Sequence, residues 1–153
     1  KFFHEYDDSI KNYFSFCFVR NPIERAISAF YFLHNGGLNQ FDLFDAEKFI
    51  LPYKKNFNSF VRNEFPKEKI FKQLHFVPQN KWIVNTRDEI CVDYVGRFEN
   101  IEFELEKIKN LFGIEINKQP RLNKGIKEKF KLDDDVVELI QHFYKRDFTL
   151  FNY

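Results

Sequence analysis

The first strongly patterned stretch lies early in the chain, where an apolar run gives way to helical spacing. Residues Phe14–Val19 are continuously apolar and aromatic apart from Ser15, which is typical of a strand buried on both faces of a parallel sheet. Asn21 and Pro22 end this strand, and proline suits the first turn of a helix. From Ile23 onward, apolar residues recur at helical spacing, at Ala26, Ile27, Phe30 and Leu33. This spacing predicts a helix, which should end near Asn35–Gly37.

The rest of the chain alternates strand-like and helix-like segments. Ile90–Val95 predicts a second buried strand. Asn100 is placed to cap a helix over Ile101–Phe112, which Gly113 would end. Further helices are predicted over Asp45–Phe49, over Asn58–Glu64, from Val77-Pro78-Gln79 to Ile83, and from Asp133–Asp135 onward. Strands that alternate with helices favour an α/β fold.

The composition is that of a single folded domain over residues 1–153. Hydrophobic residues make up 44% of the chain and charged residues 31%, with a formal net charge of +1. This balance gives no sequence-wide footprint for nucleic acid and no polybasic membrane anchor. No apolar run approaches the roughly 20 residues of a membrane span. We therefore expect no nucleic-acid partner and no membrane segment in this chain.

The two cysteines, Cys17 and Cys91, lie in apolar, strand-like runs. Two cysteines make neither a disulfide framework nor a zinc site. We expect buried free thiols in a reducing compartment, and no metal site.

Three polar residues interrupt the apolar pattern where the first strand meets its helix. Arg20 falls at the carboxyl end of the strand, where ligands bind in open α/β sheets. Arg25 and Ser28 are three positions apart and share a helix face. A guanidinium, a hydroxyl and a helix start all suit an anion such as phosphate. The alternative is that both arginines pair with nearby acids and that Ser28 faces solvent.

The segment RNPIERAISAFYFL resembles the 3′-phosphate-binding segment of sulfotransferases, which reads roughly Arg-Asp/Asn-Pro, two residues, Arg, two residues, Ser. It is most similar to glycan-type enzymes, the heparan and uronyl 2-O-sulfotransferases and their bacterial relatives. HFVPQNKWI, DYVGRFENI and the final HFYKRDFTLFNY follow the same family pattern in the same order. The resemblance therefore covers most of the chain.

The resemblance implies a P-loop-NTPase-like parallel sheet flanked by helices, with 3′-phosphoadenosine 5′-phosphosulfate (PAPS) as sulfuryl donor. Arg20 and Ser28 would hold the 3′-phosphate of PAPS, while Arg25 would shape that site or bridge to an acid. The reaction implied is sulfuryl transfer to an acceptor hydroxyl, which requires positioning, cationic groups and a base.

One part of the family pattern is absent from the printed sequence. Members of the family carry a phosphate loop close to Pro-Lys-Thr-Ala/Gly-Gly-Thr-Ser, and neither this loop nor a Walker sequence occurs here. We expect the first strand and the phosphate loop to lie upstream of Lys1, so that the chain is the C-terminal portion of a longer domain. A degenerate relative without the loop is the alternative.

The candidates for the general base are His4 and His75. His4 lies between the expected loop and Arg20, and His75 precedes VPQN, a segment that approaches the acceptor in the family. A surface position for His4 and a structural role for His75 are the alternatives. In the basic loop PRLNKGIKEK, Asn123 and Lys124 are candidate cofactor ligands, although Gly125 replaces the usual hydroxyl residue. A solvated run of charges is the other interpretation of this loop.

The predicted function is transfer of a sulfuryl group from PAPS to a hydroxyl of a carbohydrate or related acceptor. The alternatives are a non-catalytic nucleotide- or glycan-binding module of the same fold and a nucleotide-dependent phosphotransferase. The missing loop favours the binding module, whereas the missing Walker sequence argues against the phosphotransferase. The protein is expected in the cytoplasm if it is bacterial and in the Golgi lumen if it is eukaryotic.

Overall fold

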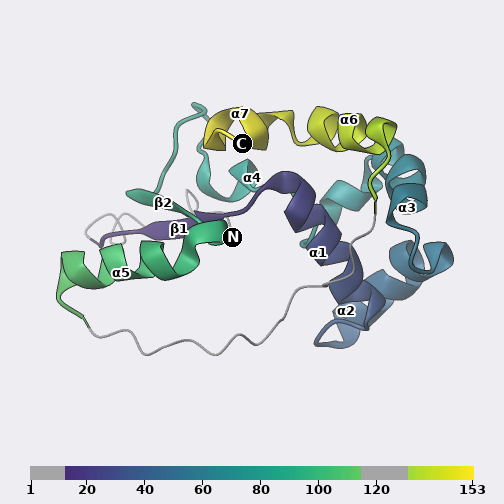
Figure 1. The fold of residues 1–153 in the computed structure, drawn as a ribbon, viewed down its shortest axis with the longest axis horizontal. Coiled ribbons are helices and arrows are strands. Elements are labelled where there is room, and N and C mark those ends of the chain that lie inside the picture. The colour runs from purple at the N-terminus through teal and green to yellow at the C-terminus, as the bar shows by residue number, and fades with distance from the viewer. Residues whose placement is uncertain (1–12, 115–130) are drawn as a thin grey trace. The chain divides into compact units, whose positions relative to one another are not determined.

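A computed structural model describes residues 13–114 and 131–153 of the chain (Figure 1). The chain folds into two compact units, each assembled from two separate stretches of sequence. We call them the strand unit, drawn from residues 1–20 and 79–124, and the helical unit, drawn from residues 21–78 and 125–153. A single domain over residues 1–153 stays a prediction.

The strand unit is built on a parallel pair of strands. Strand β1 (Phe16–Val19) pairs with β2 (Tyr94–Arg97), and the register sets Phe16 opposite Tyr94 and Val19 opposite Arg97. Just before the pair begins, the Asp93 carboxylate accepts hydrogen bonds from the backbone N–H and the hydroxyl of Ser15, both at 2.8 Å. These two bonds join the ends of the strands and fix the register.

Helix α5 (Ile101–Phe112) packs against β2 in the same unit. Gly96 permits the close packing, because a Cβ there would stand 2.7 Å from the Phe18 ring and 3.3 Å from Glu104 Cβ. The Tyr94 hydroxyl donates a hydrogen bond to the buried Glu104 carboxylate, and Lys107 lies 3.2 Å from the same carboxylate. The face of α5 that meets the strand is therefore held by polar contacts as well as by packing.

The helical unit consists of short helices around an aromatic core. Its α-helices are α1 (Pro22–His34), α2 (Gln40–Asp45), α3 (Phe57–Glu64), α6 (Asp134–Phe143) and α7 (Lys145–Phe151). A π-helical turn over Ala46–Ile50 and 3-10 turns over Leu51–Tyr53, Phe65–Lys67 and Lys69–Lys72 join these helices. Phe60 is fully buried at the centre, with ring centroids 5.0 Å from Phe30 and 5.3 Å from Phe76. Much of the Phe-rich composition therefore serves this core.

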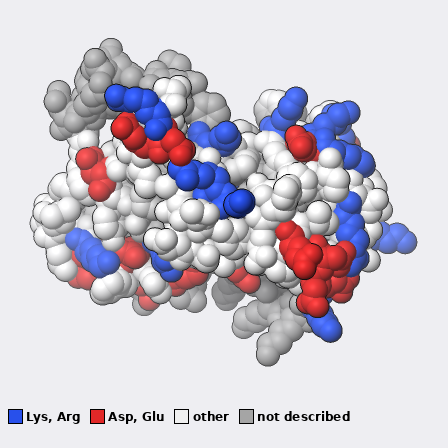
Figure 2. All heavy atoms as spheres, turned by 90° about the horizontal axis from the view of Figure 1, so that it is seen from above, with Lys and Arg blue, Asp and Glu red and all other residues white. Residues whose placement is uncertain are grey.

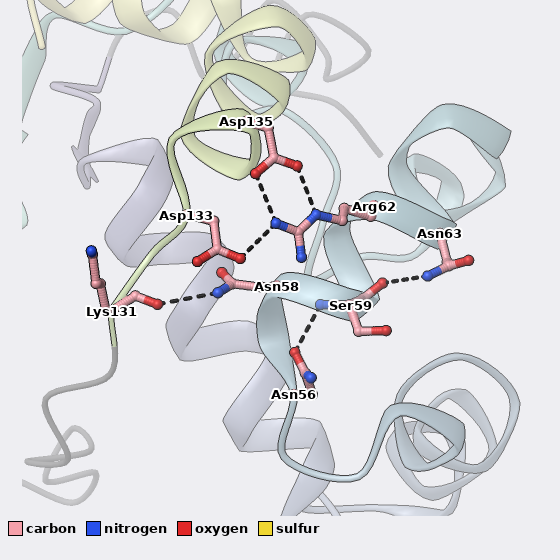
Figure 3. A network of polar contacts seen from close by, with 8 residues as sticks. All are labelled: Asn56, Asn58, Ser59, Arg62, Asn63, Lys131, Asp133 and Asp135. Carbon is pink, nitrogen blue, oxygen red and sulfur yellow. Dashed lines mark hydrogen bonds and ion pairs between the residues drawn. The ribbon is translucent and has the colours of Figure 1, made fainter.

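An exposed ion-pair network joins α3 to the start of α6 (Figure 3). Arg62 Nε and Nη2 donate to the two carboxylate oxygens of Asp135 at 2.6 and 2.7 Å, and Nη2 also donates to Asp133 at 2.5 Å. Asn58 Nδ2 donates to the Lys131 carbonyl at 3.1 Å. A fork-to-carboxylate pair of this kind is directional, so it fixes the orientation of α6 on α3.

Most predicted elements are present, but three predictions about the strands and one about a cap are wrong. The first strand is shorter than Phe14–Val19, and Phe16 is 45% exposed, so β1 is not buried on both faces. The second strand begins at Tyr94 and extends to Arg97, whereas Ile90 forms only an isolated antiparallel bridge with Val84. Asn100 precedes α5 as expected, but its side chain makes no capping hydrogen bond. The fold remains mixed, with a small parallel sheet, which is consistent with the predicted α/β class.

Three general expectations, on the cysteines, the charge and membrane spans, can be compared with the described residues. Cys17 and Cys91 are free, as predicted, although both are only partly buried, and burial raises the pKa of the Cys17 thiol to about 11. Acidic and basic side chains both occur over the face drawn in Figure 2, in keeping with a net charge of +1. Among the described helices, none combines the length and apolar character that crossing a membrane requires.

Candidate functional site

Arg20 lies immediately beyond β1, at the carboxyl end of the strand, as predicted. Its backbone N–H donates to Gln79 Oε1 and its carbonyl accepts from Gln79 Nε2, both at 2.8 Å. Its guanidinium lies over the Phe98 ring, 5.3 Å from the centroid. The strand unit therefore holds both the backbone and the side chain of Arg20, and a planar cation held in this way suits a phosphate group.

The amino-terminal end of α1 is capped by residues of the same segment. Asn21 caps the helix, and its side-chain oxygen accepts from the N–H groups of Ile23 at 2.9 Å and Glu24 at 3.3 Å. Pro22 has no N–H, and the Arg25 N–H donates to the Asn21 carbonyl at 2.9 Å. The first-turn donors thus have partners within the segment itself. A contribution of the helix start to anion binding stays a prediction.

Arg25 belongs to a buried polar cluster in the helical unit. It donates a hydrogen bond to the Tyr144 hydroxyl and interacts with the charge of Asp147, a residue with no exposed surface. Burial lowers the pKa of Arg25, while Tyr144 and Asp147 raise it. Tyr144 in turn donates to the Phe76 carbonyl at 2.8 Å. Arg25 therefore has Tyr144 as a hydrogen-bond partner and the charge of Asp147 nearby, and its role in shaping a phosphate site stays a prediction.

Ser28 lies one turn after Arg25 on α1, in the middle of the helix. It is partly exposed, whereas the neighbouring Ala29 and Phe30 are buried in the aromatic core. The apolar face of α1 therefore points to the core, as predicted, and Ser28 lies outside that face. A role for Ser28 as a phosphate ligand stays a prediction.

His75 forms a close pair with a carboxylate. Its Nε2 lies 2.9 Å from Asp42 Oδ1, and its ring centroid lies 5.1 Å from that of Phe32. Asp42 also accepts from the Leu38 N–H at 2.9 Å and from Asn39 Nδ2 at 3.0 Å. A carboxylate that orients an imidazole is the arrangement a general base needs, and it also ties the turn before α2 to His75. The structure is compatible with both interpretations of His75.

A hollow of about 550 Å³ opens at the start of α3 within the helical unit. Its lining includes Lys54, Lys55 and Lys131, together with Asn56 and Ser59. Of these residues, Figure 3 labels Lys131, Asn56 and Ser59. The three cations would favour an anionic group. Of the predicted site residues that the structure describes, none lines this hollow.

Three predicted site residues, His4, Asn123 and Lys124, lie outside the described residues. Over the ranges that are described, no group of His, Cys, Asp and Glu is placed to hold a metal ion. Sequence reasoning missed three residues that interact with predicted site residues or with Arg25: Gln79 with Arg20, Asp42 with His75 and Asp147 with Arg25. The signal for Gln79 was its position in HFVPQN, and the signal for Asp147 was the need of Arg25 for an acid.

Comparisons with known proteins agree with the resemblance seen in the sequence. The Sulfotransferase family matches the chain over residues 1–153. A relative from Archaeoglobus fulgidus, described as an uncharacterized protein, is 24% identical over 119 residues, which make up 78% of this chain and 83% of the relative. No solved structure matches the chain significantly. With a family match that spans its whole length, the chain belongs to the Sulfotransferase family.

Proposed function

We propose that the protein transfers a sulfuryl group from PAPS to a hydroxyl of a carbohydrate or related acceptor, on a P-loop-NTPase-like fold. The observation that carries the proposal is Arg20, held at the carboxyl end of a parallel strand in a chain of the Sulfotransferase family. Ligands bind beyond the carboxyl ends of such strands, and a fixed guanidinium recognises phosphate oxygens.

In this proposal Arg20 binds the 3′-phosphate of PAPS, and Ser28 stays a predicted phosphate ligand. PAPS, when bound, supplies the sulfuryl group. His75, oriented by Asp42, would accept the proton of the acceptor hydroxyl during sulfuryl transfer, and adenosine 3′,5′-bisphosphate would leave as the bond from its 5′-phosphate to sulfur breaks. His4, Asn123 and Lys124 stay predicted contributors from the remaining segments.

The test measures binding of adenosine 3′,5′-bisphosphate, which carries the 3′-phosphate but no sulfuryl group, by isothermal titration calorimetry. We expect the intact protein to bind and Arg20→Ala to lose on the order of 1.5–3 kcal/mol of binding free energy, because a charged partner of the phosphate is removed. The matched control is Arg87→Ala in the same unit, whose side chain is 79% exposed and pairs with Glu89 at 3.4 Å. This control should bind as the intact protein does.

Equal affinities of the intact protein and Arg20→Ala would contradict the proposal, and so would an intact protein that does not bind. Transfer of labelled sulfate from PAPS to a glycan then separates the two surviving functions. Binding together with transfer supports the enzyme. Binding without transfer, in a full-length protein, favours the non-catalytic module.

A further inference from the structure

The side chain of Gln79 makes an unusual pair of contacts with one residue. Its amide donates to the Arg20 carbonyl and accepts from the Arg20 N–H, both at 2.8 Å. A carboxamide offers the same donor and acceptor as a peptide group, so Gln79 binds Arg20 as a neighbouring strand would. The residue is 9% exposed, which shields both bonds from water.

The position of Arg20 explains why such a partner is needed. The pairing of β1 with β2 ends at Val19 opposite Arg97, so Arg20 lies one residue beyond the last pair in the register. Its partly buried peptide groups would otherwise lose hydrogen bonds on folding, which is costly. Gln79 supplies those bonds at the point where the strand pairing stops.

The position of Gln79 is itself fixed by local structure. It follows Pro78 and precedes helix α4 (Asn80–Ile83), with helical backbone angles of φ −62° and ψ −36°. Its carbonyl accepts from the Trp82 N–H at 3.1 Å. A glutamine anchored at a helix start can hold its side chain in one orientation, which a residue in a loop could not do as reliably.

We propose that Gln79 is a positioning residue for Arg20 and that it presets the guanidinium for the phosphate of the sulfuryl donor. The inference rests on the proposed function, in which Arg20 binds that phosphate. Gln79 holds the Arg20 backbone, and the Arg20 guanidinium lies over the Phe98 ring. Arg20 therefore loses little conformational entropy when the phosphate binds. Gln79 thus contributes to affinity without touching the ligand.

The first test compares Gln79→Met with the intact protein in calorimetric titrations of adenosine 3′,5′-bisphosphate. Methionine has similar length but makes neither bond, and we expect about tenfold weaker binding. Gln79→Glu is the second variant, because an ionised carboxylate still accepts from the Arg20 N–H but cannot donate to its carbonyl. It should also bind more weakly than the intact protein.

The matched control is Asn85→Ala in the same unit. The Asn85 side chain also bonds backbone groups, accepting from the N–H of Arg87 at 2.8 Å and of Glu89 at 3.0 Å. Its loss should lower the stability of the strand unit and leave the affinity for the bisphosphate unchanged. An equal loss of affinity in this control would show a general effect of destabilisation and would overturn the inference.

A double variant tests whether Gln79 acts through Arg20. If it does, Arg20→Ala with Gln79→Met should bind no more weakly than Arg20→Ala alone. Losses that add, or a Gln79→Met variant that binds as the intact protein does, would overturn the inference.

A measurement without ligand separates this inference from the proposed function. Hydrogen exchange of the Arg20 amide should accelerate in Gln79→Met, since its acceptor is gone. If the intact protein does not bind the bisphosphate, the proposed function is wrong. The exchange rate of the Arg20 amide still tests whether Gln79 holds the Arg20 backbone. Unchanged exchange at Arg20 would overturn the inference.

Discussion

The carboxylate of Asp42 accepts hydrogen bonds from three partners in the helical unit. The backbone N–H of Leu38 lowers the pKa of Asp42 most, followed by the bond from His75, and Asn39 adds a smaller contribution. Gly37 makes this arrangement possible, because it has a φ of +63° and a Cβ there would lie 2.1 Å from Asp42 Cβ. The turn before α2 is therefore built around one ionised side chain.

The lowered pKa of Asp42 predicts how stability depends on pH. Because the folded-state pKa lies below the unfolded value, the stabilisation is complete above the unfolded pKa and disappears as the pH falls through the folded pKa. Asp42→Asn should therefore lower the free energy of unfolding at about pH 7, and the deficit should shrink toward about pH 3. Urea unfolding at a series of pH values measures this difference.

Asp45, on the same helix, provides the control with the opposite sign. Burial raises the pKa of Asp45, so its ionisation opposes folding and the penalty is largest at neutral pH. Relative to the intact protein, Asp45→Asn should raise the free energy of unfolding most at neutral pH, and this gain should disappear in acid. Parallel pH dependences for the two variants would contradict the roles assigned to these carboxylates.

At the scale of the element, the cap of α1 carries a measurable share of stability. Asn21 accepts from two first-turn N–H groups, and its replacement by alanine typically costs about 1 kcal/mol. Asn21→Ala should therefore lower the free energy of urea unfolding by that amount. Asn21→Asp keeps an acceptor oxygen and should retain most of the stability that the cap contributes.

Asn100 is the matched control for this prediction. It occupies the same position before α5 but makes no capping hydrogen bond with its side chain. Asn100→Ala should change the free energy of unfolding by only a few tenths of a kcal/mol. An equal cost at both positions would mean that the observed bonds of Asn21 do not account for its effect.

The limits of prediction are clearest in the strands. Helix α1 follows the sequence closely, because a cap, a proline and regular apolar spacing are all local signals. The second strand was misplaced because Ile90–Val95 is the apolar run, while pairing with β1 selects Tyr94–Arg97. That pairing joins residues that are 78 positions apart, through contacts such as Asp93 with Ser15, and no local pattern reports it.

The same difference between local and distant signals applies to the candidate site. The position of Arg20 beyond a strand could be predicted, because it depends on neighbouring residues in the sequence. The contact of Arg20 with Gln79 and that of Arg25 with Tyr144 could not, because each partner comes from a distant segment. The quoted family-like segments contain both partners, so a resemblance pointed to the right segments without giving their contacts.

At the scale of the whole molecule, the two units offer separate probes. Trp82 is the chain's one tryptophan and lies in α4 of the strand unit, while most helices belong to the helical unit. Phe60→Ala removes a fully buried ring from the core of the helical unit and should cost about 3–5 kcal/mol. The midpoint measured by circular dichroism should therefore fall more than the midpoint measured by Trp82 fluorescence.

Gly96→Ala is the reciprocal control, because the added methyl group would collide with Phe18 in the strand unit. Gly96→Ala should lower the midpoint measured by Trp82 fluorescence more than the midpoint measured by circular dichroism. Identical shifts by both probes in both variants would show that the units unfold as one cooperative body and would contradict the prediction.

The interleaving of the two units has a consequence for biosynthesis. Residues 21–78 emerge from the ribosome before α6 and α7, which complete their core, and all of residues 79–124 are translated in between. During that interval, phenylalanines such as Phe30, Phe60 and Phe76 lack partners such as Ile140 and Tyr144. Nascent chains paused in this window should engage chaperones or aggregate, so slow translation here would reduce the yield of folded protein.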